Sequence, residues 1–477
     1  MFEIKSKYPL LFTDSEGEFK DLHSPNDLKK ISTVQWATSS DVEKLLTQIK
    51  SHQKNFQTIS KLEISNALKH VAKRILENKE SFAHLIALEG GKPLKDAIVE
   101  VERASLTFNL CAEEATRTHG EMIPMERSTA AQGKIAFTMK EPIGPVLAIS
   151  AFNHPLNLLA HQVGCALASG CVLILKPSPG TPLNAYHLKK LLSETNLPDE
   201  VLTIVPCDVP EIEKMISHPS FGYVSFIGSA KVGWSLRSKL APGTRIGLEH
   251  GGIAPAIVHH DADVSRAVKS LIKGAFYHAG QVCISTQRIF VHRNVQQTFT
   301  ELFIEEVKKL KTGSATLPDT DVGPLIRPSE VTRIKSWIDE AIQMGANLLI
   351  GNEIRGEHKQ YLLPTVLCNV SESAKLMNEE VFGPVVCINE YEDLDLQMEK
   401  LSETDLVFES SIFTNDMSIF MKAVKMIPAM SLVINEHTAF RVDWMPFGGH
   451  KASGLGMGGV KYSMEEMTRT KQIIIAP

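Results

Sequence analysis

The chain has 477 residues, of which 43% are hydrophobic and 22% charged, and its 50 basic and 55 acidic side chains give a formal net charge of −5. This composition excludes a disordered chain, and the length predicts about two to four domains at roughly 100 to 200 residues per domain. No concentrated run of Lys and Arg is present, so we expect no nucleic-acid partner.

The seven cysteines include no CxxC pair and form no short disulfide framework, which favours a reducing, cytoplasmic compartment. The first eleven residues lack the apolar core of a secretory signal. The longest apolar tract, Pro155 to Leu175, is interrupted by polar residues such as Asn157 and His161. We therefore expect no membrane span there, but a buried helix followed by a strand.

In chain order, the residues before about 120 have an extended start and then apolar residues at helical spacing. Beyond them, short β-rich runs alternate with helical stretches, which is typical of parallel, doubly wound sheets. We predict two α/β domains that meet near Gly251–Gly252. The expected strands are Val146–Ser150, Val172–Leu175, Val201–Val205 and Tyr223–Ile227 in the first domain, and runs near Ala256–Val258, Arg288–Val291, Leu348–Ile350, Val385–Ile388, Ser411–Phe413 and Leu432–Ile434 in the second.

Two glycine-containing segments are candidates for a phosphate site. Gly454–Gly459 matches GxGxxG, but no strand precedes it, so we reject it as a dinucleotide fingerprint and expect a tightly packed loop over 446–459. In Phe226–Gly233 a β-run ends at Gly228-Ser229 and a helix begins, so backbone amides and the Ser229 hydroxyl can hold a phosphate. A capped helix after a tight turn is the open alternative.

Three polar side chains lie next to predicted strands and suit acyl chemistry through a covalent sulfur intermediate. Cys283 precedes a strand and is a candidate nucleophile, Glu249 ends a strand and is a candidate base, and Asn153 follows a strand and can donate to an oxyanion. The alternatives are an inert buried thiol, an acid in a salt bridge and an Asn turn before proline.

These three residues lie in a series of motifs by which the chain resembles the aldehyde dehydrogenase superfamily of NAD(P)-dependent, CoA-independent enzymes. The resemblance covers nearly the whole length. The 34 residues from Glu249 to Cys283 are similar to the family's own spacing. The motifs, in the family's order, are Glu89–Pro93, Phe152–Pro155, Lys176–Ser178, Phe226–Ser229 with Gly233, Leu248–Gly252, Gly280–Cys283, Gly323–Ile326, Glu379–Pro384, and Pro446–Gly449 with Lys451 and Ser453-Gly454.

The resemblance implies a mechanism. The Cys283 thiolate attacks the aldehyde, the Asn153 amide and the Cys283 N–H stabilise the oxyanion, hydride passes to NAD or NADP, and Glu249 activates the water that hydrolyses the thioester to a carboxylic acid. The implied coenzyme-binding residues are Lys176 for the adenosine ribose, with Ser178 in the same motif, Ser229 and the following helix for the pyrophosphate, with Gly228 and Gly233 in the same motif, Glu380 for the nicotinamide ribose and Phe382 beside the nicotinamide.

The resemblance also implies a domain plan. The ranges 1–119 and 143–249 form a Rossmann-like NAD(P)-binding domain, and 250–457 form the catalytic domain. A β extension at 120–142 and 458–477, with the apolar run Lys471–Pro477, builds a homodimer or homotetramer. An exposed apolar strand of this kind needs a partner edge.

Two departures from the family pattern bear on function. Pro179 stands where many NAD-preferring relatives have a Glu that binds the ribose 2′-OH, so the choice between NAD and NADP is open. Met457-Gly458 stands where the family often has Arg-Glu, so a carboxylate near the base is missing. The presence of Glu249 argues against a CoA-acylating enzyme. That enzyme, a thiol esterase and a catalytically silent scaffold are the alternatives.

The substrate tunnel resembles the family's at six positions, which are His154, Leu158, Tyr277, Val282, Ile284 and Arg441. His154 and Arg441 favour a small polar or anionic aldehyde, such as a semialdehyde or hydroxyaldehyde, over a long fatty one. The alternative is that Arg441 pairs with Asp443 or another acid and that His154 merely packs. We expect no metal site, because His259 and His260 are adjacent on a predicted strand and would point to opposite faces.

Overall fold

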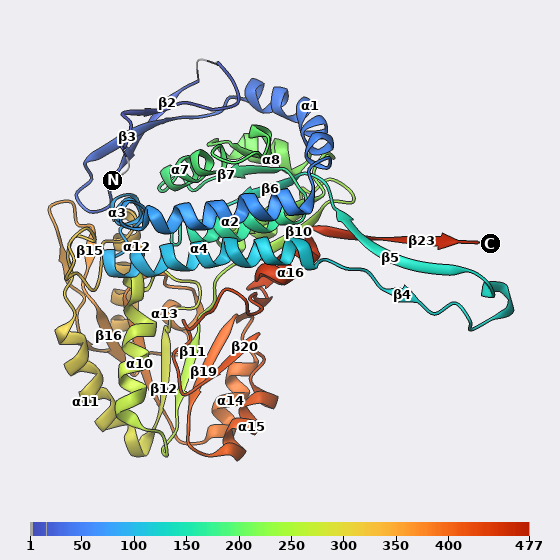
Figure 1. Cartoon of the computed structure of the whole chain (residues 1–477). Helices are drawn as coiled ribbons and strands as arrows, with labels where there is room; N and C mark the ends of the chain where they lie inside the picture. Colours follow the sequence, from blue (N-terminus) through green and yellow to red (C-terminus); the bar gives the residue numbers. More distant parts are fainter. Residues whose placement is uncertain (1–2, 16, 477) are drawn as a thin grey trace.

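The computed structural model describes residues 3–15 and 17–476. Met1, Phe2, Glu16 and Pro477, which belong to the predicted ranges 1–119 and 458–477, lie outside the described residues. The molecule contains two large sheets in two α/β halves, with a narrow β arm projecting to one side (Figure 1). The prediction of two doubly wound α/β units is confirmed.

The chain begins with a small sheet and then four helices, as its extended start and helical spacing predict. Side-chain caps fix two of the helix starts, because Thr38 and Asp41, and likewise Ser60 and Glu63, form reciprocal capping boxes. The elements are β1 (Lys7–Tyr8), β2 (Phe19–His23), β3 (Lys30–Gln35), α1 (Ser39–Phe56), α2 (Lys61–Glu77), α3 (Lys79–Gly90) and α4 (Leu94–Arg117).

The first large sheet has the strand order β22-β10-β9-β6-β7-β8, and all four predicted runs form strands in it. Its pairs are parallel except for the antiparallel edge strand β22. Its strands are β6 (Val146–Ile149), β7 (Leu173–Lys176), β8 (Leu202–Ile204), β9 (Tyr223–Ile227), β10 (Arg245–Glu249) and β22 (Gly454–Leu455), and its helices are α5 (Asn157–Leu159), η2 (Ala160–Gly164), α6 (Cys165–Ala168), α7 (Leu183–Leu192), η3 (Asp199–Val201), α8 (Val209–Ile216) and α9 (Ala230–Arg237).

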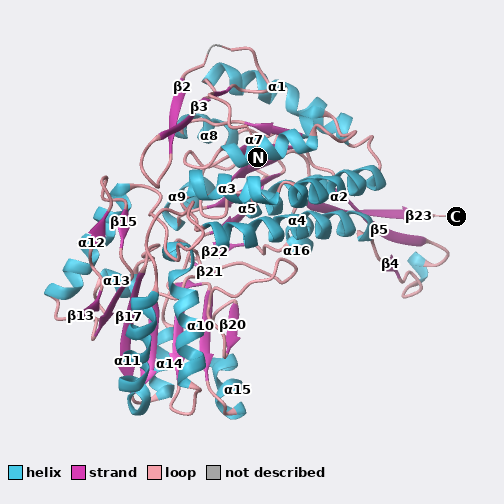
Figure 2. Cartoon of the chain, turned by 60° about the vertical axis from the view of Figure 1, so that its left-hand side comes forward, coloured by secondary structure: helices cyan, strands magenta, loops and turns pink. Residues whose placement is uncertain are grey.

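The second large sheet has the order β13-β16-β17-β12-β11-β19-β20, with helices on both faces (Figure 2). The edge strand β13 is antiparallel to β16, so this sheet too departs from the purely parallel prediction at one edge. Its elements are β11 (Pro255–Val258), α10 (Val264–Phe276), η4 (Tyr277–Gly280), β12 (Arg288–His292), α11 (Arg293–Lys309), α12 (Pro328–Gln343), β13 (Asn347–Ile350), β16 (Thr365–Cys368), α13 (Lys375–Asn378), β17 (Val385–Tyr391), α14 (Leu394–Ser402), β19 (Glu409–Phe413), α15 (Met417–Met426) and β20 (Ser431–Ile434).

The glycine-rich stretch 446–459 is tightly packed, as expected, but it also contains two very short strands. A Cβ on Gly449 would lie 2.3 Å from the Ser453 carbonyl oxygen, and one on Gly454 would lie 2.5 Å from that of Leu248. Only glycine permits this close approach of backbones. The short elements of this half are β14 (Ile354–Arg355), β15 (Tyr361–Leu362), β18 (Leu406–Val407), β21 (His450–Lys451) and α16 (Val460–Glu466).

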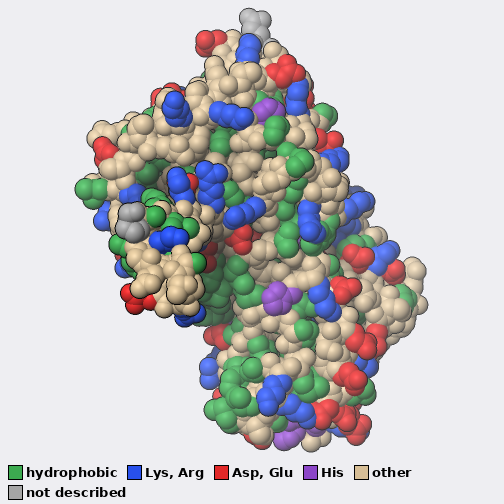
Figure 3. All heavy atoms as spheres, turned by 90° about the vertical axis from the view of Figure 1, so that its right-hand side faces the viewer, with side chains coloured by type: hydrophobic (Ala, Val, Ile, Leu, Met, Phe, Trp, Pro, Cys, Tyr) green, Lys and Arg blue, Asp and Glu red, His purple; other side chains and the backbone are tan. Residues whose placement is uncertain are grey.

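The arm is a three-stranded antiparallel sheet of order β23-β5-β4. The C-terminal strand pairs with β5 over eight residues, from Thr468 opposite Pro142 to Ile475 opposite Ile135. Figure 3 views the molecule from the side of the arm and shows hydrophobic side chains on it and beside it. The arm consists of β4 (Met122–Ile123), η1 (Thr129–Ala131), β5 (Ile135–Pro142) and β23 (Thr468–Ile475).

The turn after β11 corrects the expectation for the two adjacent histidines. β11 ends at Val258, so His259 and His260 lie beyond the strand, and their ring centroids are 4.2 Å apart. The alternation of side chains that holds within a strand does not continue into a turn. The expectation of opposite faces is therefore wrong.

No helix among residues 3–15 and 17–476 combines the length and the apolar character needed to cross a membrane.

Candidate active site

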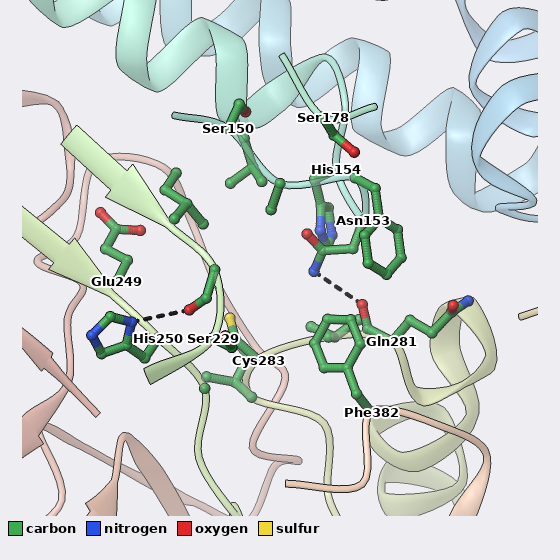
Figure 4. A pocket seen from close by; sticks show the side chains of 18 of the residues that line it. Ser150, Asn153, His154, Ser178, Ser229, Glu249, His250, Gln281, Cys283 and Phe382 are labelled. Carbon is green, nitrogen blue, oxygen red and sulfur yellow. Dashed lines mark hydrogen bonds between the residues drawn. The ribbon is translucent and has the colours of Figure 1, made fainter. Parts of the chain in front are cut away.

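A cavity of about 790 Å³ lies between the two large sheets and brings the predicted site residues together (Figure 4). The strands of the first sheet end at this cavity, whereas those of the second sheet begin beside it. Of the predicted residues, Gly233 alone is not part of the wall. The wall includes Asn153, His154, Leu158, Lys176, Ser178, Gly228, Ser229, Glu249, Tyr277, Val282, Cys283, Ile284, Glu380, Phe382 and Arg441.

Cys283 lies in the loop that joins η4 to β12, and Asn153 contacts the same loop. The Asn153 amide nitrogen donates to the Gln281 carbonyl at 2.9 Å. The Gln281 side chain is itself held, because its oxygen accepts from the Ile326 N–H at 2.9 Å. One amide hydrogen of Asn153 thus fixes its position, and the second remains available to an oxyanion.

A buried ion pair supports the loop that carries Asn153. Glu100 accepts hydrogen bonds from the backbone N–H groups of Leu156 (2.8 Å) and Asn157 (3.1 Å), at the start of α5. Its other oxygen pairs with Lys92, and both side chains are fully buried. This pair satisfies amide groups that would otherwise be unpartnered at a helix start and so fixes the path of the chain after Asn153.

The Cys283 thiol is partly exposed, and its surroundings do not activate it in this state. Burial, followed by the nearby Glu380 carboxyl, raises the pKa of the thiol, and Arg441 acts in the opposite direction. Hydrophobic side chains pack around its loop, namely Val282, Ile284, Phe408 and Phe447. A thiol is nucleophilic in its thiolate form, so this thiol would have to lose its proton before it could attack a substrate.

Glu249 ends β10 and faces a narrow space on the far side of the strand end. Its backbone pairs with Ile227 of β9 and Gly454 of β22. Burial raises the pKa of its carboxyl, whereas Arg441 and His161 act to lower it. In Figure 4 the carboxylate is turned away from Cys283, and a Cβ on Gly458 would lie 2.4 Å from its Oε1.

The turn after β9 has the form predicted for a phosphate site. The helix α9 begins at Ala230, and its N-cap residue Ser229 makes no side-chain capping bond. His250 fixes the turn, since its Nδ1 lies 3.0 Å from the Gly228 carbonyl oxygen. A Cβ on Gly233 would lie 2.0 Å from the His250 ring, so this glycine lets the ring pack against the helix.

The other predicted coenzyme residues lie on both sides of the cavity. Lys176 ends β7 and is 8% exposed, and burial lowers the pKa of its ammonium group. Burial raises the pKa of Glu380 to about 8, and its Oε1 is buried without a hydrogen-bond partner. Phe382 has a φ of 53° and contacts Phe152 edge to face at 5.8 Å. Such backbone strain in a residue other than glycine is common at functional sites.

Arg441 forms no ion pair with Asp443, unlike in one of the alternatives considered for it. Asp443 is instead bound by Arg103 (2.8 and 2.9 Å), His161 (2.9 Å) and Asn157 (3.0 Å). Although burial disfavours the carboxylate, the bonds from His161 and Arg103 hold the pKa of Asp443 far below its usual value.

The guanidinium group of Arg441 therefore lines the cavity. It stacks over the Phe447 ring at 3.5 Å, its terminal nitrogen lies 3.4 Å from His161 Nε2, and its Nε is buried without a partner. No carboxylate forms an ion pair with it within the described part of the chain. Arg441 is half-buried, and a partly desolvated cation without a counter-ion favours an anionic ligand.

His154 packs against Tyr277, with ring centroids 6.0 Å apart. Burial, and then the positive charge of Lys92, lowers the pKa of His154 well below its usual value. The imidazole is therefore neutral at pH 7, and it can offer a hydrogen bond but no charge to a substrate.

Some residues of this site were not predicted from the sequence. Arg103, Asn157 and Phe440 lie in the cavity wall outside the motifs, and Glu100 supports the Asn153 loop from α4 without reaching the wall. His250 lies inside the motif Leu248–Gly252 and directly follows the candidate base Glu249. This position in the sequence indicates a residue that supports the site.

A thiol beside an amide donor, a buried carboxylate at a strand end and a helix start suited to phosphate define a cysteine-dependent oxidoreductase of the nucleotide-binding α/β class. Residues 12–473 match the Aldehyde dehydrogenase family. The chain belongs to that family, and it is an NAD(P)-dependent enzyme that oxidises aldehydes.

Three similar proteins extend this finding. A 3-sulfolactaldehyde dehydrogenase of Priestia aryabhattai is 40% identical over 440 residues, which are 92% of this chain and 91% of that protein. The crystal structure of aldehyde dehydrogenase 21 from Physcomitrella patens, in complex with the product succinate, has a TM-score of 0.95 and 33% identity, with 99% and 98% coverage. Glyceraldehyde-3-phosphate dehydrogenase GapN from Methanocaldococcus jannaschii, complexed with NADP, has a TM-score of 0.92 and 35% identity, with 97% and 100% coverage.

Proposed function

We propose that the substrate is a small aldehyde that carries a second, anionic group. The observation that carries this proposal is the Arg441 guanidinium, which lines the cavity with a buried, unpartnered Nε. Asp443 does not neutralise it, because Arg103 and His161 already occupy that carboxylate. The three similar proteins support the same class: one is a 3-sulfolactaldehyde dehydrogenase, one binds the product succinate and one is a glyceraldehyde-3-phosphate dehydrogenase, and these compounds all carry an anionic group.

In the proposed mechanism the Cys283 sulfur bonds to the aldehyde carbon, and the negative charge moves to the carbonyl oxygen. That oxygen accepts from the second amide hydrogen of Asn153 and from the Cys283 backbone N–H. When bound, NAD(P) would supply a hydride acceptor. Loss of the hydride turns the thiohemiacetal on Cys283 into a thioester.

Glu249 is the proposed base for hydrolysis of the thioester. Its carboxylate lies against Gly458 and must turn about its side-chain bonds toward Cys283 to reach a water molecule there. The water loses a proton to Glu249 and attacks the thioester carbon, the carbon–sulfur bond breaks, and the acid is released. The pKa of Glu249, raised by burial, brings the carboxyl closer to a working range near neutrality.

The coenzyme fits residues on both sides of the cavity. We infer that Lys176 and Ser178 contact the adenosine ribose, that Gly228, Ser229 and the α9 start hold the phosphates with Gly233 behind them, and that Glu380 and Phe382 contact the nicotinamide riboside. The unpartnered Oε1 of Glu380 and the uncapped start of α9 support this fit.

We infer further that the enzyme accepts NADP as well as NAD. The charged residues that line the pocket beside Pro179 are Lys20, Lys176 and Asp21, of which Asp21 is paired with Lys30 at 2.7 Å, and no carboxylate occupies position 179 to repel a 2′-phosphate. Lys20 already pairs with Asp208 at 2.8 Å, so a phosphate would share this lysine with that acid.

The domain plan stays a proposal: 1–119 and 143–249 bind the coenzyme, 250–457 carry the catalytic thiol, and 120–142 with 458–477 build a homodimer or homotetramer. Two large exposed side chains of the arm, Met122 (70%) and Ile474 (57%), support an interface there. The free thiols among the described cysteines support a reducing, cytoplasmic compartment.

The proposal is tested by measuring reduced nicotinamide formation with succinic semialdehyde, glycolaldehyde and decanal, each with NAD and with NADP. We expect the anionic aldehyde to give the highest kcat/KM, and the Arg441→Met variant to lose that preference while Arg441→Lys retains part of it. A higher kcat/KM for decanal, or an unchanged preference in Arg441→Met, would refute the substrate class. Adding CoA should yield no acyl-CoA, and an acyl-CoA product would favour the acylating alternative.

A further inference from the structure

A cluster of histidines lies at the end of the second sheet that is remote from the cavity. β11 begins at Pro255, close to Glu249 in the chain, and β12 begins at Arg288, soon after Cys283. The opposite ends of these strands carry His259 and His292. Since each residue of a strand advances by about 3.3 Å, the cluster lies more than about 10 Å beyond the cavity wall.

The carboxyl ends of four parallel strands meet in this cluster. His259 follows β11, His292 ends β12, Tyr391 ends β17 and Thr414 follows β19. The rings of His259 and His260 lie 5.4 and 5.1 Å from that of His292. Burial and then His260 lower the pKa of His259, and the same two causes lower the pKa of His292.

Three side chains of the turn present ligand atoms to a common point. One atom each from His259, His260 and Asp261 lies within 4.8 Å of the others. In a tetrahedral zinc site with bonds of about 2.0 to 2.1 Å, neighbouring ligand atoms are about 3.3 Å apart. The three atoms must therefore close by at most about 1.5 Å, which rotation of the exposed His260 side chain can supply.

The surrounding contacts hold two of the three ligands in place. His259 Nδ1 lies 2.8 Å from the Tyr391 hydroxyl, so Nδ1–H can donate there and leave the Nε2 lone pair for a metal ion. Asp261 accepts from the Thr414 hydroxyl (3.0 Å) and the Asn415 N–H (2.8 Å). Such partners orient ligands in known metal sites.

His292 has a different part in the cluster. Its Nδ1 accepts from the Asn294 N–H at 3.2 Å and caps α11, so in its neutral form the proton is on Nε2. It therefore borders the site without being a ligand.

We propose that His259, His260 and Asp261 form a binding site for a divalent transition-metal ion of the zinc class, separate from the catalytic cavity. Two imidazole nitrogens and one carboxylate oxygen leave a fourth position for water. This donor set suits Zn²⁺, Ni²⁺ or Cu²⁺ better than Mg²⁺ or Ca²⁺, which prefer oxygen ligands. The ion would fasten the turn after β11 to the ends of β17 and β19 and so stabilise the folded chain.

The test measures Zn²⁺ binding by calorimetry and the melting temperature with and without Zn²⁺. The full-length Cys283→Ala variant serves as the parent, because the catalytic thiol can itself bind zinc. We expect one ion per chain and a higher melting temperature with Zn²⁺. Adding His260→Ala should raise the Kd at least tenfold and abolish the temperature shift. The matched control, His358→Ala, removes an exposed histidine in the loop between β14 and β15 and should bind as the parent does.

Asp261→Asn provides a second variant, and its melting temperature without metal reports whether the Thr414 and Asn415 contacts survive. With Cys283 intact, His260→Ala should keep the aldehyde dehydrogenase rate, so a failure of the metal site and a failure of the proposed substrate class are distinguishable. If the parent shows no saturable binding of one ion, or if His260→Ala binds Zn²⁺ equally well, only an adventitious ion is involved and the proposal is overturned.

Discussion

The two large sheets meet the cavity with opposite ends. The first sheet presents the carboxyl ends of its strands, where Asn153, Lys176, Ser229 and Glu249 follow or end β6, β7, β9 and β10. The second sheet presents amino ends, where Cys283 precedes β12 and Glu380 precedes β17, and Arg441 reaches the cavity from the segment after β20. The rule that ligands bind at the carboxyl ends of parallel strands thus holds for one sheet of this molecule and not for the other.

This difference separates the tasks of the two halves. A helix that follows a strand offers its amide groups to a phosphate, so the first sheet suits the coenzyme. A loop that precedes a strand offers no such helix start, but it can hold one reactive side chain against a packed core, as the Cys283 loop does. The carboxyl ends of the second sheet are left for other uses, and the histidine cluster lies there.

The largest expected effect concerns the second sheet, whose amino ends meet the cavity. Cys283→Ala removes the proposed nucleophile, and we expect aldehyde oxidation to fall by roughly 10³-fold or more. NAD(P) binding should persist, because the first sheet supplies most of the proposed contacts. Steady-state rates and a coenzyme titration by intrinsic fluorescence measure the two effects. Substantial activity in the variant would show that the thiol is not the nucleophile.

The sequence predicted most of this arrangement where local patterns determine structure. The β-rich runs and the strand-end positions of Asn153 and Glu249 follow from alternation of strands and helices, and the order of motifs indicated the family. The partners of Arg441 could not be predicted in this way. Asp443 is its neighbour in sequence, but Arg103 and His161 reach that acid from helical segments far away in the chain.

The His259-His260 pair was misjudged for a similar reason. Periodicity gives the direction of side chains within a strand, but it does not show where the strand ends. β11 ends at Val258 and does not continue through His259 and His260, so both rings lie in a turn, side by side. The antiparallel edge strands β13 and β22 likewise depend on long-range pairing, which local sequence does not encode.

The second-largest expected effect concerns the first sheet, whose carboxyl ends meet the cavity, and where Glu249→Gln removes the proposed base. We expect kcat to fall by about 10²- to 10⁴-fold, while the first turnover still produces reduced nicotinamide. The deprotonated carboxylate is the active form, and burial raises its pKa above the value of about 4.3 for an exposed glutamate. In the unchanged enzyme kcat should therefore rise with pH through that raised pKa, and the variant should lack this rise.

Rapid-mixing measurements distinguish this expectation from a general loss of activity. A burst of one reduced nicotinamide per site followed by a slow phase is expected for Glu249→Gln. A variant without a burst, or with the pH profile of the unchanged enzyme, would contradict the role of base.

The third effect concerns the support of the first sheet's Asn153 loop. Glu100→Gln leaves Lys92 buried without its counter-ion, so we expect a loss of about 3 to 5 kcal/mol in the free energy of unfolding and a lower kcat. The double variant Lys92→Met with Glu100→Gln removes both charges and keeps an oxygen acceptor for the Leu156 and Asn157 N–H groups. It should recover stability and much of kcat, as measured by denaturant unfolding and steady-state rates. A double variant as unstable as the single one would rule out the unpaired charge as the cause.

The smallest expected effect concerns Gly458, which follows the antiparallel edge strand β22 of the first sheet and lies against the proposed base Glu249. An added Cβ in Gly458→Ala would lie 2.4 Å from Glu249 Oε1 and 2.9 Å from the Phe447 carbonyl oxygen, so the carboxylate must move. If Gly458 provides the space in which Glu249 rests, the variant should change the rate of the slow hydrolysis phase several-fold while the hydride-transfer burst stays the same. Gly313→Ala is the matched control, because the nearest atom to its added Cβ, the Thr320 hydroxyl oxygen, is 3.6 Å away. Equal hydrolysis rates in the two variants would show that the glycine which replaces the family's usual acid does not influence the base.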